Sequence, residues 1–243
     1  MDSATTLPAT RDHPMHVLRV IASPRGTESE SRRLSQEILE ALTLQAGGRT
    51  LHATDLDTNE LPAVDGSYAA ALASPADPDS PPAPGTTLHR SDRLIAQLDA
   101  ADVVVIATPI HNFTLPSALK AWVDHIVRIR STFCVTPQGK VGTLRNRPVY
   151  VALSCGGFIS GDRARQPDFL RPYLQHTLAT VGLHDVHFVS VEGTALGEAA
   201  LLAGRQRASE AVAALFDAYG CSLRTATNGT PLDRHHEAAS ALA

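Results

Sequence analysis

Four short apolar runs, separated by segments with a helical spacing of apolar residues, constrain the fold of this chain most strongly. The runs cover residues 16–22, 102–108, 148–154 and 186–191, and a weaker run covers 50–54. Continuous apolar runs of this length are typical of parallel strands buried on both faces. The segments between them repeat apolar residues every three or four positions, as helices that cover a sheet do. The sequence therefore predicts an α/β sandwich with five parallel strands.

The length of 243 residues fits one such domain with additional segments. We expect the domain to span residues 15–222. Residues 1–14 and 223–243 are polar and lack apolar periodicity, so we expect an unstructured extension and a flexible tail. Residues 62–87 are rich in proline, so we expect them to form a mobile insertion loop after the second strand.

Composition excludes several classes of function. The net charge of -4 and the pI near 6.2 give no electrostatic case for binding nucleic acid or an anionic membrane. No segment approaches the roughly 18 consecutive apolar residues of a membrane span. Cys134, Cys155 and Cys221 are odd in number and contain no CxxC pair, so neither a disulfide framework nor a zinc site is indicated. We expect no metal site and a cytoplasmic protein.

A serine-rich segment follows the first strand. Ser23, Ser29 and Ser31 lie where this strand ends and a helix begins. Hydroxyl groups and backbone N–H groups at the positive end of a helix suit a phosphate group. The alternative is that the serines only cap the helix. The sequence contains no GxGxxG motif and no Walker loop. It therefore gives no indication of dinucleotide binding of the Rossmann type or of nucleoside triphosphate binding.

Two further loops follow strands of the same predicted sheet. The segment from Pro109 to Phe113 follows the strand predicted at 102–108. The Asn112 side chain and the backbone groups of this segment can form hydrogen bonds with the edge of a flat heterocycle. Alternatively, Asn112 only forms a turn and Phe113 packs in the core. The segment Ser154-Cys155-Gly156-Gly157 follows 148–154, and its glycines permit a close backbone approach to a ligand, or merely end the strand.

The three loops follow the first, third and fourth strands. In a sheet of order 2-1-3-4-5 these strands are neighbours, and open α/β sheets bind ligands at the carboxyl edge where the order reverses. A phosphate after the first strand, with a flat ring held by the next two loops, describes flavin mononucleotide, FMN.

Several motifs carry a family resemblance. The segments SPRGTESES, PIHNFTLPSALKAWVDHIVRIRSTF with the following TPQGKVG, and SCGG resemble the FMN-dependent NAD(P)H:quinone oxidoreductases and azoreductases of the flavodoxin-like fold. The resemblance runs from about His16 to Tyr219. It implies a three-layer sandwich with a five-stranded parallel sheet of order 2-1-3-4-5.

The resemblance also implies roles for individual residues. Ser23, Ser29, Glu30 and Ser31 would hold the FMN phosphate, whereas Pro109, Ile110, His111, Asn112 and Phe113 would border the ribityl chain and the ring. Ser154, Cys155, Gly156 and Gly157 would meet the pyrimidine side of the ring. The segment 128–142 would form a hairpin that reaches the flavin pocket of a second copy, which implies a homodimer with flavin sites at its interface.

Three residues depart from the family pattern. Members commonly have Met-Tyr where this chain has Ile110-His111, and Arg where it has Cys155. Loss of a cation near the pyrimidine edge changes how a reduced, anionic flavin is stabilised. His111 is either a proton donor or part of the pocket wall. Cys155 is either a reactive thiol or a small buried residue.

These features predict an FMN-dependent oxidoreductase. Hydride from NADH or NADPH would reach a quinone, azo or nitro-type aromatic acceptor through the flavin, in a ping-pong scheme. Two alternatives remain at this point. The chain could be a flavin enzyme dedicated to one biosynthetic or tailoring step, or a flavin-binding electron carrier without an activity of its own.

Overall fold

The structure, a computed structural model, describes residues 13–74 and 81–226, with side chains described as far as residue 218. Its central sheet contains five parallel strands. They are β1 (Met15–Ile21), β2 (Leu51–Asp57), β3 (Val103–Pro109), β6 (Val149–Cys155) and β7 (Val186–Glu192), in the order β2-β1-β3-β6-β7. Because β4 and β5 form a separate hairpin, this order is the predicted 2-1-3-4-5 topology, and the predicted fold is confirmed.

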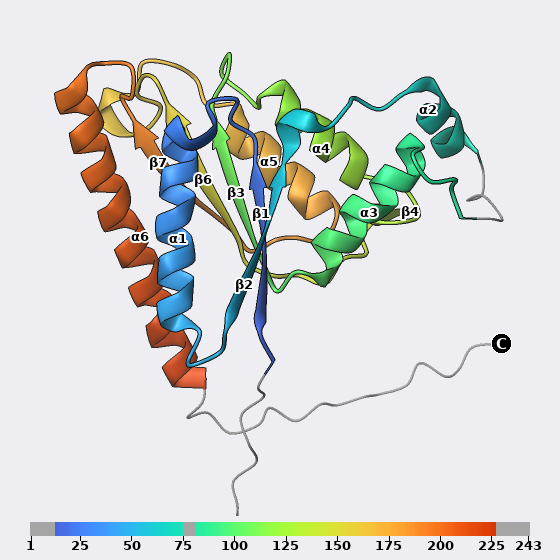
Figure 1. Cartoon of the computed structure of the whole chain (residues 1–243), viewed down its shortest axis with the longest axis horizontal. Helices are drawn as coiled ribbons and strands as arrows, with labels where there is room; N and C mark the ends of the chain where they lie inside the picture. The colour runs from blue at the N-terminus through green and yellow to red at the C-terminus, as the bar shows by residue number, and fades with distance from the viewer. Residues whose placement is uncertain (1–12, 75–80, 227–243) are drawn as a thin grey trace, which may run out of the picture.

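Helices cover both faces of the sheet (Figure 1). On one face lie α1 (Glu30–Gln45) and α6 (Glu198–Ala226), whose buried residues share a core with Val103 and Val105 of β3. On the other face lie α3 (Thr87–Ala100), α4 (Ser117–Ile126) and α5 (Leu170–Thr180), which pack on Val104 and Ile106. Successive residues of β3 thus enter different cores, which is why its apolar run shows no alternation. Within residues 13–74 and 81–226, no helix has the length and apolar character that a membrane span requires.

The proline-rich segment 62–87 differs from the expected loop, because residues 66–73 form a helix, α2 (Gly66–Ala73). Asp65 caps it by accepting a hydrogen bond from Tyr68 N at 2.8 Å. The Tyr68 ring is buried, and its hydroxyl donates to Asp124 O at 3.1 Å. A cap and one anchored aromatic ring therefore order a segment whose composition indicated mobility. Residues 75–80 of the expected insertion loop lie outside the described residues.

The described residues reach beyond the expected end of the domain at residue 222. Helix α6 continues to Ala226, so residues 223–226 of the expected tail are helical. The expected N-terminal extension lies almost wholly outside the described residues, as does the tail from residue 227. Helix α4 begins at Ser117, with Pro116 as its N-cap.

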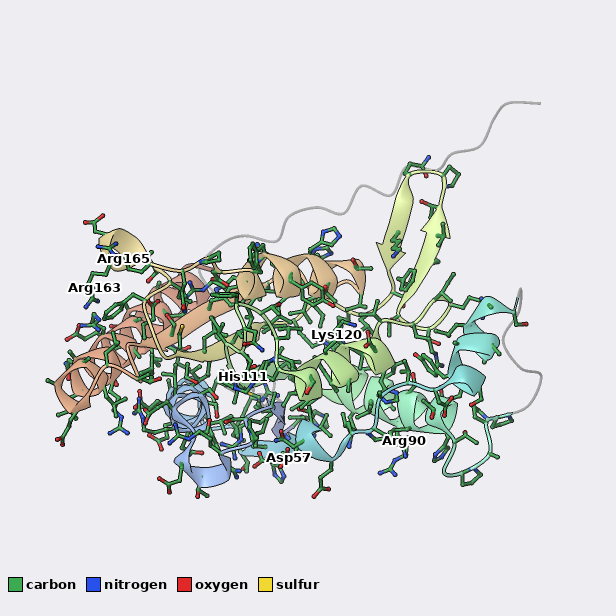
Figure 2. All side chains as sticks on the ribbon, turned by 90° about the horizontal axis from the view of Figure 1, so that it is seen from above. Asp57, Arg90, His111, Lys120, Arg163 and Arg165 are labelled. Atoms are coloured by element: carbon green, nitrogen blue, oxygen red, sulfur yellow. The ribbon has the colours of Figure 1, made fainter. Side chains whose placement is uncertain are left out.

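The hairpin expected in segment 128–142 is confirmed. Strands β4 (Phe133–Thr136) and β5 (Gly139–Gly142) pair antiparallel. The hairpin projects away from the body of the molecule (Figure 2). Val135 and Val141 on it are 63% and 49% exposed.

His125 on α4 is fully buried beneath the segment that leads to α2. Its Nε2 lies 3.1 Å from Pro62 O, and its Nδ1 has no hydrogen-bond partner among the described residues. Burial lowers the pKa of His125 below the ordinary value of 6.5, against a smaller opposing effect of the bond to Pro62. The folded state therefore holds His125 in its neutral form.

This burial predicts a pH dependence of stability. Because the unfolded chain takes up a proton at His125 more readily than the folded one, the free energy of unfolding should fall as the pH drops below about 6.5. The loss from this group cannot exceed about 1.4 kcal/mol per pH unit. Urea unfolding at several pH values measures this effect, and the free energy of unfolding should depend less on pH in His125→Asn than in the parent protein. An equal pH dependence in both proteins would contradict the lowered pKa of His125.

Candidate functional site

The loop between β1 and α1 gathers hydroxyl groups at the start of a helix. Ser29 is the N-cap of α1, and its Oγ accepts from Arg32 N at 3.3 Å. Ser29 Oγ and Ser31 Oγ share a hydrogen bond of 2.9 Å. Ser23, at the end of β1, is buried and its Oγ accepts from Arg25 N at 3.4 Å. The first N–H groups of α1 point out of the helix end, so this loop can cradle an anion.

Glu30 makes a different contribution from that of the serines. Its carboxylate accepts hydrogen bonds from Arg205 Nε at 2.9 Å and from Arg33 Nε at 3.1 Å. The bond from Arg205 is the main cause that lowers the pKa of Glu30, and burial opposes it. The two cations neutralise this carboxylate next to the predicted phosphate position. Only the backbone N–H of Glu30 is available to a phosphate.

The segment that connects β3 with α4, residues 110–116, contains a two-residue turn. His111 N donates to Thr114 O and Thr114 N donates to His111 O, both at 3.0 Å. The two central residues, Asn112 and Phe113, have φ angles of 48° and 71°. A left-handed conformation costs a bulky residue such as Phe113 about 1–2 kcal/mol, and such strain is concentrated at functional sites.

The turn is held in place by its neighbours and presents aromatic surface. Ile110 N donates to Ser154 O at 2.8 Å, and Phe169 N donates to Phe113 O at 3.1 Å. The Phe113 ring is 46% exposed and that of Phe169 is 58% exposed. The alternative that Phe113 packs in the core is therefore wrong. Two exposed rings at the carboxyl edge of a sheet can form the wall of a site for a flat ligand.

The third loop follows β6. Ser154 and Cys155 end this strand, and both are buried. A Cβ at Gly156 would lie 3.3 Å from the Cβ of Ala195, a tight approach that requires Ala195 to shift by a few tenths of an ångström. A Cβ at Gly157 would make only ordinary contact with Gln166. Packing against neighbouring residues therefore restricts Gly156 more than Gly157.

A buried carboxylate that the sequence analysis missed holds this loop. Glu192, the last residue of β7, accepts from Ile159 N at 2.9 Å and from Ser160 Oγ at 2.7 Å. Burial alone would raise the pKa of Glu192, but hydrogen bonds from Ser160, Ile159 and Ser190 lower it. Its position directly after an apolar strand was the available signal, because that places it at the same sheet edge.

A second missed element lies next to Ser23. The short helix η2 (Thr58–Glu60) follows β2, and Thr58 Oγ1 donates to Ile21 O at 3.1 Å. Asn59 Nδ2 donates to Ser23 O at 3.0 Å. These bonds fix the end of β1, from which the serine loop starts.

Cys155, which directly precedes Gly156 and Gly157, is buried. Its Sγ accepts from Gln166 Nε2 at 2.8 Å, and burial raises the pKa of its thiol. The raised pKa disfavours the nucleophilic thiolate. The structure thus favours the buried-residue interpretation over the reactive-thiol one.

The two described cysteines should differ strongly in reactivity. Cys134 on β4 is exposed, whereas Cys155 is 3% exposed. In a Cys221→Ser background, iodoacetamide should label Cys134 at least about 100-fold faster than Cys155, since alkylation requires an accessible thiolate. Peptide mass spectrometry measures both rates, and labelling of Cys155 should rise in urea. Equal rates in the folded protein would contradict this environment for Cys155.

The three loops lie at the same edge of the sheet, because each follows the carboxyl end of a strand. Strands β1, β3 and β6 are adjacent, and α1 covers one face of the sheet while α4 covers the other. The strand order reverses between β1 and β3, and open α/β sheets bind ligands at such a switch point. His111 lies near the middle of this edge (Figure 2).

The residues present fit FMN. Hydroxyl groups and helix-end amides stand where a phosphate would be held, and the Glu30 carboxylate beside them is neutralised by arginines. The exposed Phe113 and the Gly156-Gly157 segment stand where a ring would lie. Within the part of the chain that the structure describes, no group of His, Cys, Asp and Glu residues could hold a metal ion.

Comparison with known proteins gives the same picture. The family model described as "Flavodoxin-like fold" matches residues 15–215. FMN-dependent NADH:quinone oxidoreductase 4 of Pseudomonas fluorescens is 42% identical over 209 residues, which are 85% of this chain and 99% of the relative. FMN-dependent NADH:quinone oxidoreductase 2 of Cupriavidus pinatubonensis is 42% identical over 191 residues, 79% of this chain and 92% of the relative.

Solved structures agree on the fold. An FMN-dependent NADH-azoreductase from Bacillus anthracis in complex with FMN superposes with a TM-score of 0.67, at 24% identity, over 83% of this chain and 99% of that one. With the family model and the curated relatives, this confirms the resemblance found in the motifs. The chain therefore belongs to the flavodoxin-like family of FMN-dependent NADH:quinone oxidoreductases.

Proposed function

We propose that this chain binds FMN in the crevice between β1 and β3 and uses NADH or NADPH to reduce quinones and azo or nitro-type aromatic acceptors. The observation that carries the proposal is the convergence of the serine loop, the Asn112-Phe113 turn and the Gly156-Gly157 segment at the switch point. The names of relatives with 42% identity support the same activity.

Each loop has a distinct task in this proposal. The α1 N-terminus with Ser23, Ser29 and Ser31 binds the phosphate, and the rigid turn at Asn112 and Phe113 positions the ring. The Ser154–Gly157 segment, held through Glu192, borders the other side of the ring. When bound, FMN would supply the hydride-transfer chemistry between the pyridine nucleotide and the acceptor.

His111 is the side chain of the turn that can exchange a proton with the acceptor. It is exposed at the carboxyl edge, where an acceptor would approach the ring. Reduction of a quinone consumes protons, and a positioned imidazole can supply one. If it does so, His111→Gln lowers kcat more than KM and changes the pH profile of kcat.

Steady-state kinetics test the activity. The FMN-saturated protein is assayed with NADH or NADPH and menadione, each varied at several concentrations of the other. Parallel lines in double-reciprocal plots are the expected result, because donor and acceptor would occupy the same site in turn. Absence of turnover with both donors in fully FMN-loaded protein would contradict the proposed function.

We further propose that two copies assemble with the hairpin of each near the flavin site of the other. The projecting hairpin exposes Val135 and Val141, and Phe113 and Phe169 are exposed at the site edge. Exposed apolar side chains, here on the hairpin and at the site edge, are typical of surfaces that bind a partner. A symmetric pair would cover them in both copies.

Val135→Asp should weaken this assembly, because a charge would be buried at the contact. Light scattering after size-exclusion chromatography should give the mass of two chains for the parent protein and a concentration-dependent shift to one chain for the variant. Gln138→Asp at the hairpin tip provides a control of equal charge, with a smaller expected effect. A monomeric parent protein at micromolar concentration would refute the assembly.

We also propose that the protein works in the cytoplasm. The reduced pyridine nucleotides that it would use are cytoplasmic electron donors, and its exposed Cys134 is a free thiol that a reducing compartment preserves. Fractionation of cells that express the chain tests this location, and recovery in an oxidising compartment would contradict it.

A further inference from the structure

A second cavity lies apart from the flavin site. It has a volume of about 410 Å³ and lies between the end of β2, the loop at residues 84–86 and the outer side of α3. Leu56, Leu61 and Leu94 form apolar parts of its wall, and His89, Arg90 and Arg93 of α3 form the polar part. This volume is within the range of small-molecule sites.

The polar part of the wall is strongly cationic. No Asp or Glu is among the described residues that line the cavity. Asp92, the nearest acidic residue in the helix sequence, is already paired with Arg128 at 2.5 Å. Among the described residues, neither Arg90 nor Arg93 takes part in a salt bridge or side-chain hydrogen bond, and the charge of Arg90 acts on the buried His125, whose pKa it helps to lower.

The backbone adds to this positive potential. Helix α3 has 14 residues and begins beside the cavity, with the lining residue Thr86 as its N-cap. The N-terminus of a helix carries a partial positive charge that favours anions. Two arginines, one histidine and a helix end therefore face a space whose remaining wall is largely apolar.

We propose that this cavity is a binding site for an organic anion. Its carboxylate, sulfonate or phosphate group would contact Arg90 and Arg93, since guanidinium groups bind such oxyanions in a bidentate manner. Its apolar body would lie against Leu56, Leu61 and Leu94. Neither an inorganic ion nor an uncharged apolar molecule would use both parts of this wall.

The site is separate from the one that would hold FMN. None of the residues assigned to the flavin lines it. The helix η2 stands between them, because Thr58 and Asn59 bond to Ile21 O and Ser23 O on the flavin side, whereas Leu56 and Leu61 on either side of η2 face the cavity. Seen from above, Arg90 lies well away from His111 (Figure 2). The ligand would bind in addition to the flavin rather than in place of it.

Binding of 8-anilinonaphthalene-1-sulfonate to the FMN-saturated protein tests the site. The probe combines a sulfonate with an apolar body, and its fluorescence gives a dissociation constant. Arg90→Gln with Arg93→Gln should raise this constant at least tenfold, and 0.5 M NaCl should raise it in the parent protein. Arg145→Gln with Arg207→Gln makes the same change of net charge elsewhere and should leave the constant within twofold.

Two further measurements locate the probe. The uncharged analogue N-phenyl-1-naphthylamine should bind at least tenfold more weakly. In protein labelled at leucine methyl groups, the probe should shift the resonances of Leu56, Leu61 and Leu94, assigned by single Leu→Ile variants. This readout does not depend on how well the arginine variants fold.

Three results would overturn the proposed anion site. Equal affinity in the Arg90/Arg93 variant and the control variant would overturn the proposal, as would unshifted leucine resonances under saturating probe. The insertion contains Asp77 and Asp79. Binding that occurs only in Asp77→Asn with Asp79→Asn would also overturn it, because the chain's own carboxylates would then be the partners of the arginines.

Discussion

Changing Ser29 to aspartate should weaken FMN binding by about 1000-fold without weakening α1. Aspartate is as good an N-cap as serine, so the hydrogen bond to Arg32 N is retained. The new carboxylate would stand within a few ångströms of the flavin phosphate. At about 4 Å and an effective dielectric constant near 20, two like charges repel by about 4 kcal/mol, which is roughly three orders of magnitude in affinity.

The matched control is Ser29→Asn. Asparagine also caps helices well and differs from aspartate mainly in charge, so the ratio of the two affinities isolates the electrostatic effect. Quenching of flavin fluorescence on binding gives both dissociation constants, and thermal unfolding of the apoproteins reports on the cap. If aspartate and asparagine bind FMN equally, Ser29 caps the helix and does not face the phosphate.

Changing Gly142 to alanine should lower the free energy of unfolding by about 3 kcal/mol, at the upper end of the usual cost of overpacking. A Cβ at this position would lie 2.1 Å from Gly182 N and 2.4 Å from Val181 C, both backbone atoms. Gly182 itself has a φ of 105°, and its own Cβ would meet Leu144 O at 2.5 Å. Two glycines thus let the base of the hairpin contact the turn after α5 directly.

For a domain of this size, such a loss lowers Tm by roughly 10 °C. Gly66→Ala is the control, since nothing lies within 4 Å of its Cβ position and it begins α2. Calorimetry should show Gly66→Ala at or above the Tm of the parent protein. If Gly142→Ala has an unchanged Tm, the hairpin base does not pack as the structure describes.

The fold was predictable because its signals are local. Four of the five strands coincide with a mainly apolar run and β2 with a weaker one, and the order of the three ligand loops follows from the topology alone. The exceptions have physical reasons. Helix α2 depends on the Asp65 cap and on the contact of Tyr68 with Asp124, which is 56 residues away along the chain. Composition reports neither of these interactions.

The candidate site was predictable at the level of loops and less so at the level of side chains. The sequence places Glu30 between Ser29 and Ser31, but only the structure shows that Arg205, from the other end of the chain, binds its carboxylate. Glu192 was missed for the same reason, since its partners Ile159 and Ser160 are distant in sequence. Long-range polar pairing leaves no periodic trace in a sequence.

The most direct test of the whole account is anaerobic stopped-flow absorbance of the FMN-loaded protein. Mixing with NADH should bleach the flavin band near 450 nm, and a second mix with menadione should restore it, with both rates at least as fast as steady-state turnover. This result would join the cofactor, the donor and the acceptor at one site. A protein that binds FMN but whose flavin band is unchanged by NADH and NADPH would contradict the account.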